Sequence, residues 1–155
     1  MNSRKEKAFS EVWKEFITAK TAKGVSDATI TKYHQVLHNI SKYFDIEIPM
    51  DKLTKREFEE MVVRMRSADL AHNSIASYVC VIRTFLHWCR DENIVKIEVP
   101  NIKEKETVKE TYSDEELELL LRRPAPDCQF CEYRNWVIIN FLLNSGCRAA
   151  TVRNI

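Results

Sequence analysis

The chain has 155 residues, of which 45% are hydrophobic and 30% are charged, and its formal net charge is +1. This length can hold one domain, or one domain and part of a second. The balanced charge excludes a chain that is basic over its whole surface, so any nucleic-acid surface must be local. The start of the chain has no apolar signal segment, and its longest apolar run is far shorter than the roughly 20 residues that span a bilayer. We therefore expect a soluble, cytoplasmic protein without a membrane partner.

Helices are the expected elements, because the chain has only two glycines and four prolines and its apolar residues recur at helical spacing. A first helix begins near Ala8 and ends before Gly24, a residue that tolerates the left-handed conformation of a helix end. Ser26 can cap the second helix. The segment from Thr54 to Glu57 is a capping box, in which side chain and backbone satisfy each other, and it opens a third helix.

A fourth helix is expected to start near Asn73 or Ser74. The apolar residues of each helix share one face, so the four helices can enclose a common core. The predicted core residues are Phe9, Val12, Trp13, Phe16, Ile17, Ile30, Tyr33, Leu37, Ile40, Phe44, Phe58, Met61, Val62, Met65, Ile75, Val79, Ile82, Phe85, Leu86 and Cys89.

The region after the fourth helix changes in composition. From Pro100 to Glu110, lysine and glutamate dominate and few side chains are apolar. Such a stretch cannot bury itself, and we expect an extended linker. A second capping box, Ser113 to Glu116, opens a short helix that Pro124 and Pro126 end, and a further helix is expected from about Glu132 to Leu143.

The cysteines and histidines give no pattern typical of a metal site. The chain has five cysteines, an odd number, and no signal segment, which fits reduced thiols in a cytosol. Cys128 and Cys131 form a lone Cys-x-x-Cys motif, whereas a zinc site needs about four ligands. His34 and His38 are spaced by one helical turn, as expected for a solvated helix edge. We expect no metal and no cofactor.

The end of the chain carries one arginine in a suggestive place. The apolar run from Trp136 to Leu143 predicts a buried helix, Gly146 permits a sharp turn, and Arg148 then starts another amphipathic segment. A guanidinium stays charged and presents a planar fork of donors, which suits a phosphoryl group that gains negative charge in a transition state. The start of a helix adds its own preference for phosphate. An arginine that pairs with a surface carboxylate is the ordinary alternative.

This turn resembles the first arginine motif of the tyrosine recombinases, the phage-integrase family. In that family an apolar helix precedes Thr-Gly-Leu-Arg and a second helix. The resemblance implies that Arg148 is catalytic. Two residues depart from the pattern, because Cys147 stands where leucine is usual and Thr151 where glutamate is common.

The helices before the linker are similar to the SAM-like core-binding domain of the same family. The segment from Asn73 to Cys89 resembles its last helix, and the segment from Ser26 to Phe44 resembles its second. The resemblance implies an all-α fold with a four-helix SAM-like core-binding domain at residues 1–98, a linker at residues 99–111 and the first helices of an incomplete catalytic domain at residues 112–155. The matching positions are Ser26, Thr29, Tyr33, Ser74, Ile75, Ile82 to Leu86, and Trp88.

In that family the second and fourth helices face the major groove, and the linker passes along the duplex. The resemblance implies the DNA-binding portion of a site-specific recombinase of a phage or mobile element, which cuts and rejoins DNA through a phosphotyrosyl intermediate. Its implied partners are double-stranded DNA at an att-like recombination site and other recombinase protomers. The candidate DNA contacts are Thr29, Lys32, Asn73, Ser74, Ser77, Tyr78 and Arg83, each of which has an ordinary alternative as a capping or surface residue.

The five tyrosines all precede Arg148, whereas the nucleophilic tyrosine of the family follows it. We expect the nucleophile and the other catalytic residues to lie beyond Ile155, so the parent protein is expected to be an enzyme and this chain alone to be inactive. Two alternatives stay open. One is a stand-alone helical DNA-binding regulator without catalytic activity, and the other is a helical protein-interaction module that touches no nucleic acid.

Overall fold

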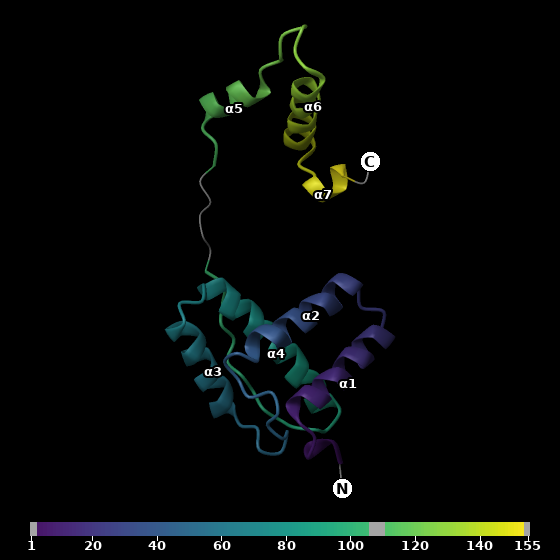
Figure 1. The fold of residues 1–155 in the computed structure, drawn as a ribbon, viewed down its shortest axis with the longest axis vertical. Coiled ribbons are helices and arrows are strands. Elements are labelled where there is room, and N and C mark those ends of the chain that lie inside the picture. Colours follow the sequence, from purple (N-terminus) through teal and green to yellow (C-terminus); the bar gives the residue numbers. More distant parts are fainter. Residues whose placement is uncertain (1–2, 106–110, 154–155) are drawn as a thin grey trace. The chain divides into compact units, whose positions relative to one another are not determined.

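The computed structural model describes residues 3–105 and 111–153, and helices are the regular elements of these ranges. The chain divides into two units, Met1–Glu106 and Thr107–Ile155 (Figure 1). The expected all-α fold is confirmed. The described elements are a short 3-10 helix η1 (Ser3–Lys5) and the α-helices α1 (Phe9–Ala22), α2 (Asp27–Ile40), α3 (Lys55–Ser67), α4 (His72–Asp91), α5 (Asp114–Leu121), α6 (Phe130–Ser145) and α7 (Ala149–Val152).

Helix α4 runs through the first unit and contacts α1, α2 and α3 (Figure 1). A cluster of aromatic rings joins it to α1, with the ring centre of Phe85 4.8 Å from that of Trp13 and 4.9 Å from that of Phe9. All three of these side chains are fully buried. Burial of each large apolar side chain contributes about 1.5–3 kcal/mol, so this cluster is a main source of the unit's stability.

Most of the predicted core is buried. Five of the predicted residues are only half-buried, namely Ile17, Ile30, Tyr33, Leu37 and Val62. The core also contains apolar residues that the predicted helix faces did not include. Three of them, Met50, Leu53 and Ile94, lie outside the helices, and the others lie within α2 or α4, namely Val36, Ala76, Val81 and Trp88.

Both predicted capping boxes are present. The backbone N–H of Thr54 donates to the Glu57 carboxylate at 2.9 Å, and that of Ser113 donates to the Glu116 carboxylate at 2.9 Å. The prediction for Ser26 is wrong in its chemistry. Ser26 does occupy the N-cap position of α2, but its hydroxyl lies 3.0 Å from the Thr29 hydroxyl and makes no capping bond to the backbone.

The chain after α4 packs back onto the first unit. Residues Ile97–Lys105, here called the strap, are not helical, and Ile97, Val99 and Ile102 are partly buried against the core. The lysine- and glutamate-rich stretch, expected as an extended linker, is not helical up to Lys105, and its Ile102 is partly buried against the core. Residues 106–110 of the expected linker lie outside the described ranges.

The second unit contains α5, α6 and α7. The indole N–H of Trp136 donates to the Leu121 carbonyl at 2.8 Å, which joins α6 to the end of α5. Helix α6 is present as predicted, but the prediction that it is buried is wrong, since no described side chain of α5, α6 or α7 is buried. Val137 and Phe141 are each 45% exposed, because α5 and α7 cover too little of α6. None of the described helices is both long and apolar enough to cross a membrane.

Candidate nucleic-acid interface

Acidic residues are almost absent from α2 and α4. Asp27, in the first turn of α2, is the one acidic residue of that helix. Asp91, the last residue of α4, is the one acidic residue of that helix. By contrast, α1 carries two glutamates and α3 carries three. Because carboxylates repel phosphate, the surface that α2 and α4 share is more favourable to a polyanion than the net charge suggests.

A hydrogen bond between side chains joins α2 to α4. The amide of Asn39 donates to the hydroxyl oxygen of Tyr78 at 3.1 Å, in a partly buried position. The Tyr78 oxygen therefore acts as an acceptor in this bond, which leaves its own O–H hydrogen to donate elsewhere. Sequence reasoning missed Asn39. Its spacing of three residues from the buried Val36 was the available indication, since that spacing places it at the edge of the core-facing side of α2.

The candidate residues on α2 differ in availability. Thr29 is half-buried, and its hydroxyl pairs with that of Ser26. Lys32 is exposed, and the described part of the chain gives it no ion pair. Lys32 is therefore the basic group of α2 that is free to meet a phosphate.

The candidates on α4 do not form one cluster. Ser74, Ser77 and Tyr78 are half-buried near its first two turns. Arg83 lies five residues beyond Tyr78, which places it about 140° further around the helix at 100° per residue. It lines a separate hollow with Ile97 and Val99 of the strap. Arg83 thus belongs to the edge of α4 that faces the strap, away from the contact with α2.

Asn73 makes two hydrogen bonds to the backbone of Lys105. Its amide nitrogen donates to the Lys105 carbonyl at 3.1 Å, and its amide oxygen accepts from the Lys105 N–H at 2.9 Å. The neighbouring His72 places its Nε2 atom 2.9 Å from the Lys103 carbonyl. In this structure, both polar groups of the predicted DNA contact Asn73 bind the strap.

Arg148 occupies the N-cap position of α7, directly after the predicted turn. Gly146 adopts a left-handed conformation with φ 61°, and its N–H donates to the Leu142 carbonyl at 2.9 Å, which ends α6. The Arg148 side chain is exposed and has no ion pair among the residues described, so the surface-pair alternative finds no support there. The expected attraction of phosphate by the N-terminus of the following helix is not supported either, because α7 has only four described residues.

The cysteines do not build a site in the described part of the chain. Cys131 is exposed and its thiol lies 3.5 Å from the Gln129 side-chain oxygen, while Cys128 is half-buried. The described ranges bring no three potential metal ligands of the histidine, cysteine or acidic type together. Cys89 is buried in the core, and burial raises the pKa of its thiol to about 12, with smaller contributions from Glu15 and Glu92.

The family profile of the phage integrase SAM-like domain matches residues 8–107, about two thirds of the chain. This stretch contains α1 to α4 and the strap. Searches of curated proteins and of solved structures found no match. The matched profile and the helical first unit agree with the resemblance carried by the sequence, and the chain belongs to the phage integrase family of tyrosine recombinases.

Proposed function

We propose that the chain binds double-stranded DNA through the surface that α2 and α4 share, as the DNA-binding portion of a site-specific tyrosine recombinase. The observation that carries this proposal is that α2 and α4 have no acidic side chain other than Asp27 at the start of α2 and Asp91 at the end of α4. Both helices project polar and basic groups, and neither carries a carboxylate between its first and its last turn.

The proposed contacts on this surface are mainly to the DNA backbone. Lys32 supplies charge, and Ser74 and Ser77 supply hydroxyl donors in the first turns of α4. Tyr78 supplies a hydroxyl that Asn39 holds in place as it donates to the Tyr78 oxygen. Contacts from basic and hydroxyl groups to phosphate position a protein on a duplex and account for much of its affinity.

We propose further that Arg148 takes part in strand cleavage and rejoining. During attack on a phosphodiester the non-bridging oxygens gain negative charge, and a guanidinium can donate to two of them at once. The exposed position of Arg148, its place directly after the Gly146 turn and the lack of a competing carboxylate in the described residues support this role. The nucleophilic tyrosine of the reaction is none of the five tyrosines that precede Arg148.

A fluorescence anisotropy titration of a labelled duplex with the full 155-residue chain tests the DNA proposal. We expect binding at low salt, with log affinity falling against log salt by about 0.9 per phosphate contact. Absence of binding at about 50 mM salt would refute the proposal and favour a helical interaction module.

Two matched lysine variants locate the surface. Lys32→Ala removes an exposed lysine of α2, and Lys14→Ala removes an exposed lysine of α1 that likewise has no ion pair in the described residues. We expect Lys32→Ala to weaken binding and to make the salt dependence shallower by about 0.9, with little effect of Lys14→Ala. Equal effects of the two variants would contradict a surface on α2 and α4.

A further inference from the structure

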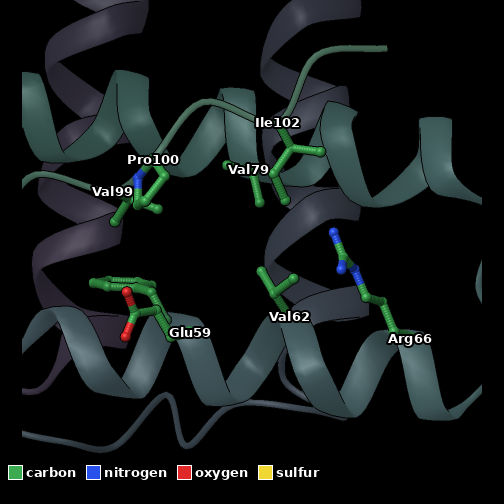
Figure 2. A pocket seen from close by; sticks show the side chains of 8 residues that line it. Glu59, Val62, Arg66, Val79, Val99, Pro100 and Ile102 are labelled. Carbon is green, nitrogen blue, oxygen red and sulfur yellow. The ribbon is translucent and has the colours of Figure 1, made fainter. Parts of the chain in front are cut away.

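The strap closes over a groove between α3 and α4. Figure 2 shows Val99, Pro100 and Ile102 of the strap facing Val62 of α3, with Val79 of α4 beside them. The open hollow between them has a volume of about 170 Å³ and is lined mostly by apolar side chains, with Glu59 and Arg66 on α3. Apolar contacts therefore hold the strap as far as Ile102 against α3 and α4. Residues 103–105, at the other end of the strap, do not line this hollow.

Hydrogen bonds from the first turn of α4 fix that far end. Asn73 donates to the carbonyl of Lys105 and accepts from its N–H, as a neighbouring peptide unit of a sheet would do. His72 binds the carbonyl of Lys103, two residues earlier. Three polar contacts thus meet the backbone of the two lysines at the end of the strap.

The reciprocal pairing of Asn73 argues against a direct role in DNA recognition. The two bonds to Lys105 occupy the edge of the Asn73 amide, one N–H and the oxygen, that would pair with a base in the same two-bond manner. The family profile extends to residue 107, so the strap lies inside the matched domain and not after it. These observations indicate that Asn73 serves the fold of the strap.

We propose that Asn73 is a latch for the strap instead of a DNA contact, and that it positions Lys103 and Lys105 beside the start of α4 to bind DNA phosphate. The role of the lysines rests on the proposed DNA-binding function. Both lysines are exposed and have no ion pair in the described residues, and the first turn of α4 contains no acidic residue that would compete with phosphate for them. Asn73 is thus a positioning residue that acts through the strap.

Amide hydrogen exchange at Lys105, measured by NMR on the full chain, tests the latch without DNA. The Lys105 N–H donates to the Asn73 side chain, so Asn73→Ala should speed its exchange by about three- to tenfold. Asn73→Asp retains an acceptor for this N–H and should speed exchange less. Ser74→Ala, one position further in the same helical turn, is the matched control and should leave exchange unchanged. Unchanged exchange in Asn73→Ala would overturn the latch.

DNA affinity in a mutant cycle tests the positioning of the lysines. We expect Asn73→Ala to weaken binding by about two- to tenfold. Lys103→Ala combined with Lys105→Ala should weaken binding and make the salt dependence shallower by about 1.8. When Asn73→Ala is added to this pair, binding should weaken no further, because the groups that it positions are gone.

Each other outcome of the cycle is decisive. An equal loss from Asn73→Ala with and without the two lysines would show that Asn73 contacts DNA directly, and would overturn the proposal. No loss from Asn73→Ala in the unmodified chain would overturn the positioning role. If the unmodified chain binds no DNA, the proposed function fails and takes the role of the lysines with it, whereas the exchange of the Lys105 amide still decides whether the latch exists.

Discussion

Single hydrogen bonds decide what several candidate side chains can do. Tyr78 and Asn73 are both polar residues near the start of α4, and the family resemblance implied the same role for both. The structure separates them, because the Asn39 amide leaves the Tyr78 O–H hydrogen available, whereas the backbone of Lys105 occupies both groups of Asn73. Partners 39 and 32 residues away in the chain cannot be deduced from the spacing of residues within α4.

Tyr78→Phe should weaken DNA binding by about two- to tenfold, because it removes a hydroxyl donor. Asn39→Asp should weaken binding at least as much, since a carboxylate accepts the Tyr78 hydrogen and also repels phosphate. Anisotropy titrations measure both effects, and Tyr43→Phe, another half-buried tyrosine of the first unit, is the control. A loss of binding in Tyr43→Phe equal to that in Tyr78→Phe would contradict a specific role for the Tyr78 hydroxyl.

Arg148→Ala in an active recombinase that contains this sequence should reduce strand cleavage by about 10²–10³-fold while DNA binding changes little. The reason is that its charge matters most when the phosphate gains negative charge. Arg148→Lys should also be poor, because an ammonium cannot reproduce the planar fork of donors. Arg153→Ala is the control, and cleavage assays beside binding titrations measure each variant. An essential Arg153 and a dispensable Arg148 would show that the arginine motif was placed in the wrong register.

Cys89 should resist alkylation at pH 8, because burial raises the pKa of its thiol to about 12 and the thiolate is the reactive form. Cys80 on the same helix is exposed and should react first, as mass spectrometry after brief treatment with iodoacetamide would show. The folded state holds this proton more tightly than the unfolded state does. The protonated Cys89 thiol therefore makes its full contribution to the free energy of unfolding below the ordinary pKa of 9.0. This contribution is lost as the pH rises toward about 12. Equal labelling of Cys80 and Cys89 in the folded chain would contradict this burial.

At the scale of elements, local sequence predicted most of the helices and failed where distant contacts decide. The Thr54 and Ser113 caps follow from residues three positions apart, so their geometry is contained in the sequence. The stretch from Pro100 was expected as an extended linker because its own composition is charged, and the partners that bind the backbone of Lys103 and Lys105 lie about 30 residues earlier in α4. The exposure of α6 has the same kind of cause, since apolar spacing within a helix does not specify what covers it.

Thr54→Ala should destabilise the first unit by about 1 kcal/mol, because α3 loses its capping hydroxyl. That hydroxyl, first among several hydrogen bonds, lowers the pKa of Glu57. The ionised Glu57 therefore contributes to the free energy of unfolding above its ordinary pKa of 4.5. This contribution is lost as the pH falls through the lowered pKa. In thermal unfolding, the difference between Thr54→Ala and the unmodified chain should narrow in acid. Thr18→Ala, whose hydroxyl bonds a carbonyl in mid-helix, is the control and should change stability less.

At the scale of the molecule, the two units differ in how many side chains they bury. The first unit encloses an aromatic core, whereas the described residues of the second unit bury no side chain. The proposed functions divide in the same way, with DNA binding on the first unit and the catalytic arginine on the second. The family assignment and the all-α fold could be predicted from the sequence, because they depend on the order of helices and on short motifs. Which candidate residues share a surface could not.

This chain alone should form no covalent DNA adduct with any of its five tyrosines. A phosphotyrosyl intermediate needs a nucleophile held in line with the phosphate, and Tyr33 and Tyr78 instead pack against the core of the first unit. Incubation with a labelled duplex that carries a nick, followed by a denaturing gel, provides the measurement. An adduct mapped to Tyr112 or Tyr133, which are exposed in the second unit, would refute the assignment of the nucleophile to another segment.

The pairing of Asn73 with Lys105 also couples the start of α4 to the end of the strap in local opening. Because His72 and Asn73 lie in the first turn of α4, fraying of that turn releases the backbone of Lys103 and Lys105 as well. The start of α4 and the end of the strap should therefore open together, and a substitution that weakens one should increase the fluctuation of the other.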